Sequence, residues 1–312
     1  MAVFRDESGR RGRAVRVASV LGAAAAVAAL GVFLVSIFPA PWSSAAQQPE
    51  PAPAGRLPQG HPLEMKARER EYRREEARLR ALLGQAQAAQ KRRKPADATE
   101  PVLAGFAVNW DDQSLVSLQQ HADQLTHAMP EWIRLGPDGT FLVEEDPRVV
   151  QAAARLELTP TVSNYADGEF QPSLLQPLLA SDKARKDAAQ RLAKLCEERG
   201  FAGVNLDFEN LDTKQWHELA ALVEAAYGEL HQRGFLLSID VPADGRGVPV
   251  ERLAAATDFL VVMAYDEHAS TDEPGPIASP SWVAASAAAY LKRAPADRIV
   301  VALGAYGYDW PL

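Results

Sequence analysis

From Pro101 onward, short apolar runs alternate along the chain with longer segments that are apolar on one side only. The apolar runs predict strands at 102–109, 132–135, 159–164, 203–208, 236–241, 259–265 and 299–304. The segments 181–199, 213–233 and 281–293 have the spacing of amphipathic helices. Strands and helices that alternate in this way indicate a parallel sheet. Because no glycine-rich phosphate loop follows the first strand, an α/β fold of the (β/α)8 barrel type is favoured over a doubly wound sheet.

The N-terminal part has a different pattern. Residues 18–38 are an apolar and small-residue run of about 20 residues, long enough to span a bilayer as a helix. Arginines dominate the segment before it, at positions Arg5, Arg10, Arg11, Arg13 and Arg16. The positive-inside rule predicts a cytoplasmic segment 1–17, one transmembrane anchor 18–38 and an extracytoplasmic position for the rest. A cleaved signal peptide is the alternative, with a small-residue cleavage site at 44–46.

Two polar segments separate this anchor from the predicted barrel. Residues 39–62 are rich in Pro, Ala, Gln and Ser, which predicts a solvated linker. Residues 63–95 carry Glu and Arg at helical pair spacings, which predicts a charged helical stalk. A coiled coil is the alternative, but most positions that would complete an apolar seam are charged. The barrel itself is expected over 101–312.

Charge and cysteine content exclude several classes of function. The net charge is −8 and the isoelectric point is about 5.4, which argues against nucleic acid as a partner. Cys196 is the one cysteine, so an intramolecular disulfide and a cysteine metal cluster are both excluded.

The stretch GVNLDFEN, residues 203–210, carries the clearest candidate chemistry. Alternate side chains of a strand share a face, so Asn205, Asp207 and Glu209 should point one way and the apolar residues between them the other. Other polar residues fall at or near the carboxyl ends of predicted strands: Trp110, Asp138, Asn164, Asp240, Tyr265 and Asp266. A barrel keeps its active site at that rim.

Three motifs resemble glycoside hydrolase family 18. FAGVNLDFEN resembles the strand-four signature that ends in Asp-x-Glu, VVMAYDEH resembles the Met-x-Tyr-Asp motif of strand six, and IVVALGAYGYDW resembles the strand-seven segment. The branch of spore-cortex-lytic and related peptidoglycan N-acetylglucosaminidases is the most similar form. The first segment, GFAVNWDDQSLVSLQQH, also resembles the hydrolase-like domain that opens bacterial fusions with polysaccharide deacetylase and glycosyltransferase domains. The resemblance covers about 101–312.

The resemblance implies a substrate-assisted reaction on an N-acetylated polysaccharide without a cofactor or metal. Glu209 would be the general acid, Asp207 would hold the acetamide N–H, and Tyr265 would donate to the acetyl oxygen. Asn205 would support Asp207 without a further charge, and Asp266 would bind a sugar hydroxyl or support the acid pair. Trp110 and Trp310 are candidate sugar-stacking faces, although Trp110 could equally belong to the core. A metal site at Asp266, Glu267 and His268 is disfavoured, because consecutive residues rarely converge on one ion.

Two departures from the family pattern keep a second function open. Ala202 and Asn205 stand where the chitinase form has acids, and the chain ends at Leu312, just after the seventh predicted strand. The alternative is a non-catalytic carbohydrate-binding domain of an envelope polysaccharide-processing protein. A barrel truncated after strand seven would also leave strands one and seven with unpaired edges and an unstable fold. Residues further downstream in a longer native protein would then restore stability and activity.

Overall fold

The computed structural model describes residues 101–310, the three residues 33–35 and the single residue 74. Its strands are β1 (Phe33–Val35), β2 (Ala104–Ala107), β3 (His127–Pro130), β4 (Ile133–Leu135), β5 (Phe141–Val143), β6 (Glu157–Leu158), β7 (Thr161–Ser163), β8 (Tyr165–Ala166), β9 (Glu169–Phe170), β10 (Gly203–Asp207), β11 (Leu236–Pro242), β12 (Phe259–Met263) and β13 (Ile299–Leu303). Its α-helices are α3 (Asp112–His121), α4 (Pro147–Ala152), α5 (Gln176–Leu179), α6 (Asp182–Arg199), α7 (Thr213–His231), α8 (Val250–Ala255) and α9 (Pro280–Leu291). All seven predicted strands and the three predicted helices are present, so the alternating α/β pattern is confirmed.

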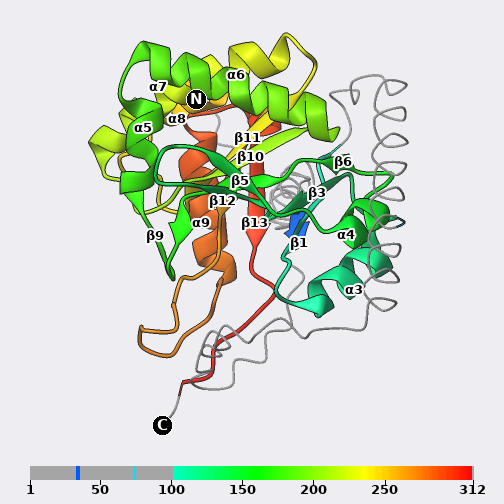
Figure 1. Cartoon of the computed structure of the whole chain (residues 1–312). Coiled ribbons are helices and arrows are strands. Elements are labelled where there is room, and N and C mark those ends of the chain that lie inside the picture. The colour runs from blue at the N-terminus through cyan, green and yellow to red at the C-terminus, as the bar shows by residue number, and fades with distance from the viewer. Residues whose placement is uncertain (1–32, 36–73, 75–100, 311–312) are drawn as a thin grey trace, which may run out of the picture.

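The strands form two main sheets that follow one another around the molecule. The larger has the order β1-β13-β12-β11-β10-β7-β4-β5, and the smaller has the order β2-β3-β6. Within them every pairing is parallel except that of β4 with β5. The helices lie outside the strands, with α6 and α7 side by side on one flank and α3 and α4 on another (Figure 1). This is the arrangement of a TIM-barrel-like α/β fold.

Two of the strands are interrupted rather than continuous. Residues 127–135 pair first through β3 and then through β4, with a break at Glu131 and Trp132. Residues 157–163 behave in the same way, and their break falls at Thr159 and Pro160. The predicted strand at 132–135 is therefore only the second half of its strand, and the first half was missed.

The prediction of an unpaired edge on the seventh strand is wrong. β1 pairs in parallel along β13, from Phe33 opposite Val301 to Val35 opposite Leu303, and it also lies against β2. No backbone ladder joins β1 to β2 in the described part of the chain, so the described residues show no closed barrel.

The predicted anchor and stalk lie almost wholly outside the described residues. Of the segment 18–38, only Phe33–Val35 is described, and these residues form a strand rather than part of a helix. Of the stalk 63–95, only Arg74 is described, and it is helical. Among the residues with a described structure, no helix combines the length and the apolar character needed to cross a bilayer.

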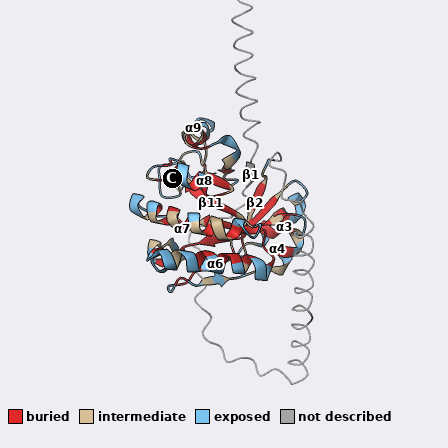
Figure 2. Cartoon of the chain, turned by 90° about the horizontal axis from the view of Figure 1, so that it is seen from above, coloured by how far each residue is buried: buried red, intermediate tan, exposed pale blue. Residues whose placement is uncertain are grey.

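Local signals explain where the two long helices begin and end. Ser181 caps α6 by accepting from the Ala184 backbone N–H at 3.1 Å, and Gly200 ends it with a φ of 71°. Asp212 and Gln215 form a reciprocal capping box at the start of α7. Both helices bury an apolar stripe that includes Leu192, Cys196, Leu219 and Val223 against the strands (Figure 2). The helices thus hold β10 and β11 from behind.

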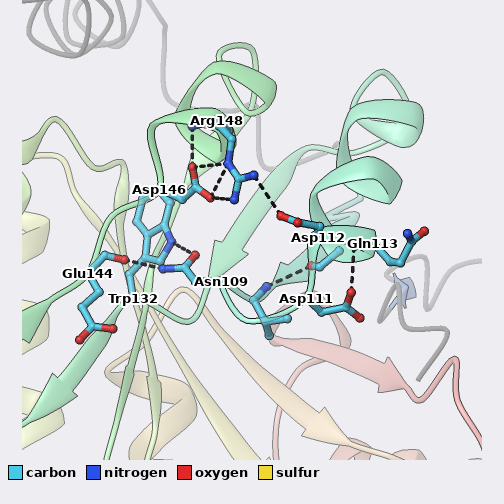
Figure 3. A network of polar contacts seen from close by, with 10 residues as sticks. Asn109, Asp111, Asp112, Gln113, Trp132, Glu144, Asp146 and Arg148 are labelled. Atoms are coloured by element: carbon cyan, nitrogen blue, oxygen red, sulfur yellow. Dashed lines mark hydrogen bonds and ion pairs between the residues drawn. The ribbon is translucent and has the colours of Figure 1, made fainter. Parts of the chain in front are cut away.

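A network of polar contacts around the buried Trp132 fixes the loops that follow β2 and β3 (Figure 3). Trp132 is 1% exposed, and its indole N–H donates to Oδ1 of Asn109 at 2.8 Å. The amide of Asn109 in turn donates to the Glu144 carbonyl oxygen at 2.7 Å. Arg148 adds an exposed ion pair with Asp112 at 3.0 Å. The network joins the carboxyl end of β2 to the break in strand 127–135, where Glu131 lies.

We expect Asn109→Ala to destabilise the fold by about 1–3 kcal/mol, because it leaves the buried indole N–H of Trp132 without an acceptor. In a domain of this size that corresponds to a fall in Tm of roughly 2–4 °C per kcal/mol. Asp112→Ala is the matched control, since it removes an exposed ion pair from the same network and should cost about 0–1 kcal/mol. Equal losses in the two variants, measured by thermal denaturation, would contradict this account.

Candidate active site

The two faces of β10 differ in the way that the sequence predicts. Val204, Leu206 and Phe208 are at most 2% exposed and belong to the main core. Asn205 is fully buried on the opposite face, and Asp207 and Glu209 are partly buried beyond it. A Cβ at Gly203 would lie 2.1 Å from the carbonyl oxygen of Leu236, so only glycine allows β11 to approach β10 this closely.

The backbone of Glu209 is held by Asn164, which is fully buried after β7. The Asn164 side chain accepts from the Glu209 N–H at 3.0 Å and donates to the Glu209 carbonyl oxygen at 3.2 Å. Asn164 therefore fixes the loop after β10 in position. The next residue, Asn210, has a φ of 60°, which places a turn directly behind the acid.

Asn205 links β10 to the neighbouring strand. Its amide donates to Oδ2 of Asp240 at 2.8 Å, and its carbonyl oxygen accepts from the Ser238 hydroxyl at 2.8 Å. Asp240 is 4% exposed, and its Oδ1 atom is buried without a partner in the described structure. The sequence placed Asp240 at the rim but did not reveal its bond to Asn205.

Glu131 is a member of this site that the sequence analysis missed. It follows β3 directly, and its backbone N–H donates to the Ala107 carbonyl oxygen at 2.9 Å. Its charge acts on Asp207 and Asp240, and that of Glu209 acts on it. The sequence contains a signal for it, because Glu131 directly follows Pro130, the last residue of β3, and so lies at the carboxyl end of a strand. The strand prediction, however, begins at Trp132 and leaves Glu131 outside.

Burial raises the pKa of every carboxyl in this group. Burial and the charge of Glu209 raise the pKa of Glu131 to about 7. Burial and the charge of Asp266 raise the pKa of Glu209 to about 7. Asp207 and Asp240 have pKa values well above the usual range, first because of burial and then because of neighbouring carboxylates. Repulsion between two carboxylates is mutual, so the raised pKa values describe the four carboxyls as a group and not any single residue.

Tyr265 and Asp266 bring the end of β12 into the same site. Burial raises the pKa of Tyr265 well above its usual value, and the charges of Asp240, Asp207 and Glu209 add to this effect. Asp266 has a φ of 60° and accepts from the hydroxyls of Tyr306 and Tyr308, the latter at 3.1 Å. Asp266 is exposed and lies near enough to Glu209 to raise its pKa.

The two tryptophans differ in their surroundings. Trp110 is 70% exposed after β2, so the alternative that it belongs to the core is wrong. Trp310 is partly buried and packs edge-on against Tyr308 at 5.9 Å, at the end of a row that runs through Tyr306 to Tyr265. The structure brings Trp310 into contact with the residues around Asp266, and it leaves Trp110 exposed.

The remaining rim candidates serve other purposes. Asp138 is exposed in the β4–β5 turn, where it accepts from the hydroxyl of Thr140 at 2.7 Å. Glu267 accepts from the backbone N–H and hydroxyl of Ser279 at the start of α9. His268 contacts the Glu273 carbonyl oxygen at 3.0 Å, so Asp266, Glu267 and His268 have three different partners. Within 101–310 and the other described residues, no group of three metal-binding side chains has a suitable arrangement.

Buried carboxyls with pKa values near 7 at the carboxyl ends of parallel strands are suited to the proton donor that one class of protein, the acid-catalysed glycosidases, requires. The family comparison agrees with this class. The model of glycosyl hydrolases family 18 matches residues 102–312, and the chain belongs to that family.

Individual relatives are similar at a lower level. The uncharacterized glycosylase YvbX of Bacillus subtilis is 26% identical over 192 residues, which cover 55% of this chain and 56% of YvbX. A chitinase from Chromobacterium violaceum has a TM-score of 0.61 at 24% identity, over 67% of this chain and 70% of that one. The spore cortex-lytic enzyme SleL of Bacillus megaterium has a TM-score of 0.57 at 15% identity, over 64% of this chain and 49% of SleL. The chain spans about half the length of the curated relatives it matches.

We expect Glu131→Gln to stabilise the fold at alkaline pH. The folded-state pKa of Glu131 is raised from 4.5 to about 7, so its protonated form favours folding below pH 4.5 and this stability is lost as the pH rises through 7. A glutamine side chain is neutral at every pH, so the variant does not lose this stability as the pH rises. The variant should exceed the wild type by on the order of 2 kcal/mol at pH 8 and by little near pH 4.5, as measured by urea denaturation.

Glu273→Gln is the control, since it removes one charge from an exposed position. If Glu131→Gln gave the same difference at both pH values, the buried carboxyl would not be the cause.

Proposed function

We propose that the domain is a glycosidase that hydrolyses β-1,4-linked N-acetylglucosamine polymers of the chitin or peptidoglycan type. The observation that carries this proposal is Glu209, a partly buried acid with a pKa of about 7 on a backbone clamped by Asn164. Such a carboxyl is about half protonated at neutral pH, and its protonated form can give the proton to a leaving oxygen. The chitinase and the cortex-lytic enzyme support the substrate class.

The other residues fit the remaining steps of a substrate-assisted reaction, in which the acetyl oxygen of the sugar attacks its own anomeric carbon. Asp207 lies next to Glu209 on the same face and would accept the acetamide N–H. Tyr265 stays protonated, because its pKa is raised, and can donate its hydroxyl proton to the acetyl oxygen. Asn205 supports this face of β10 through Asp240 and Ser238. Asp266 and the exposed ring of Trp110 would contact sugar hydroxyls and a sugar face.

Glu209→Gln tests the role of the acid. Glutamine keeps the size of the side chain and cannot give up a proton, so kcat for release of reducing ends from N-acetylglucosamine oligosaccharides should fall by about 10²–10⁴-fold with the fold unchanged. Glu144→Gln, at an exposed position, is the control. Equal turnover by wild type and Glu209→Gln would remove Glu209 from this role.

A domain that binds without hydrolysis is the competing function, as the residues at Ala202 and Asn205 suggest. It predicts saturable binding of the same oligosaccharides by the wild type with no reducing ends released. Hydrolysis by the purified protein would exclude it.

We propose further that the domain acts outside the cytoplasm on a membrane anchor. The arginine-rich residues 1–17 and the apolar run 18–38 support this topology, which requires Phe33–Val35 to lie in the bilayer instead of pairing with β13. An alkaline phosphatase reporter fused after residue 62 should be active, since this reporter folds only outside the cytoplasm. A reporter that is active only in the cytoplasm at the same junction would contradict the proposal.

A further inference from the structure

In the function proposed above, Asp240 serves only as a hydrogen-bond partner of Asn205, although it is among the most buried carboxyls of the described structure. We propose that Asp207 and Asp240 share a single proton, and that Asp240 is a positioning residue that takes this proton from Asp207 when the sugar binds. The proposal rests on the proposed function for the sugar that moves the proton. The shared proton itself rests on the geometry of β10 and β11.

The strand register places the two carboxyls side by side. β10 and β11 are parallel, with Asn205 opposite Ser238 and Leu206 opposite Ile239. The next pair along this register is Asp207 and Asp240. Partners on neighbouring parallel strands lie about 4.8 Å apart and point to the same face. The bond from Ser238 to Asn205 shows that this face is shared by the two strands.

Each carboxyl has one oxygen that needs a donor. Oδ1 of Asp207 and Oδ1 of Asp240 are both buried, and neither has a hydrogen-bond partner in the part of the chain described here. Asn205 cannot supply one, because its amide already donates to Oδ2 of Asp240 and lies 3.5 Å from the hydroxyl of Thr161. One proton held between the two orphaned oxygens would satisfy both.

The charges around the pair oppose full ionisation. The charges of Glu209 and Glu131 act on both aspartates, and the charges of both aspartates act on Tyr265, which follows β12. No cation is among the charges that act on the pair within the described structure. Two adjacent buried carboxylates without a counter-ion are therefore too costly, and a pair with one proton carries a single negative charge.

The hydrogen bonds also indicate which of the two aspartates carries the shared proton. Asn205 donates to Asp240 and so favours the ionised form of Asp240, which leaves the proton on Asp207 in the free protein. A bound acetamide N–H would donate to Asp207 and favour its ionised form instead. The proton then passes from Oδ1 of Asp207 to Oδ1 of Asp240. The pair keeps a charge of −1 throughout, so no proton has to leave the buried site.

The first experiment measures the shared proton without any assay of activity. Infrared spectroscopy of the wild type at pH 9, where Glu131 and Glu209 are ionised, should show the band of a protonated carboxyl. Asp207→Asn and Asp240→Asn should each remove this band, because the remaining aspartate no longer has a carboxylate beside it. A wild type without the band, or a band that persists in Asp240→Asn, would overturn the proposal.

The second experiment exchanges the two hydrogen-bonded residues. In Asp240→Asn, Asp207 has no neighbouring carboxylate to take its proton and must release it to solvent before it can accept the acetamide N–H. The acidic limb of the kcat/KM profile should therefore move to higher pH by about one unit or more. Asn205→Asp combined with Asp240→Asn keeps the charge and returns an acid beside Asp207, so the limb should move back. A purely structural role predicts lower activity with an unmoved limb. If the wild type hydrolyses no oligosaccharide, the proposed function fails, and the infrared band still decides the shared proton.

Discussion

The cost of burying carboxylates without a counter-ion governs this site. Glu131, Asp207, Glu209 and Asp240 lie at neighbouring strand ends, and the charges that act on them in the described structure are all negative. A fully ionised group of this kind would be expensive, so several members hold protons at neutral pH. The same constraint that destabilises the fold therefore creates acids that can work near pH 7.

The rest of the molecule supports this group from behind. The helices α6 and α7 cover the outer face of β10 with apolar contacts. The polar residues Asn205, Asp207 and Glu209 therefore lie on its inner face. The bond from Trp132 to Asn109 fixes the loop that carries Glu131. Stability is thus placed in the helices and the polar network, and the carboxyls at the rim can remain unfavourable for folding.

The sequence predicts the parts of this structure that depend on local pattern. Period-two alternation was enough to assign the faces of β10, and capping residues fit the limits of α6 and α7. The features that the sequence does not predict depend on contacts between residues that are distant along the chain. Glu131 was missed because Pro130 and the break at Trp132 hide a strand whose two halves pair with different neighbours. The pairing of β1 with β13 and the bond from Asn205 to Asp240 depend on strand order, which no local pattern contains. The structure does bring the motif residues Asp207, Glu209, Tyr265 and Asp266 close enough for their charges to act on one another.

The clamp between Asn164 and Glu209 uses only the backbone of the acid. The shape of that loop is therefore independent of the side chain at position 209, unlike sites where the acid itself is tied into a hydrogen-bond network. A form of the protein altered at this one position should keep a binding surface with native geometry. It would be suited to capturing an intact oligosaccharide in a crystal, and the bound polymer could then be identified from its density.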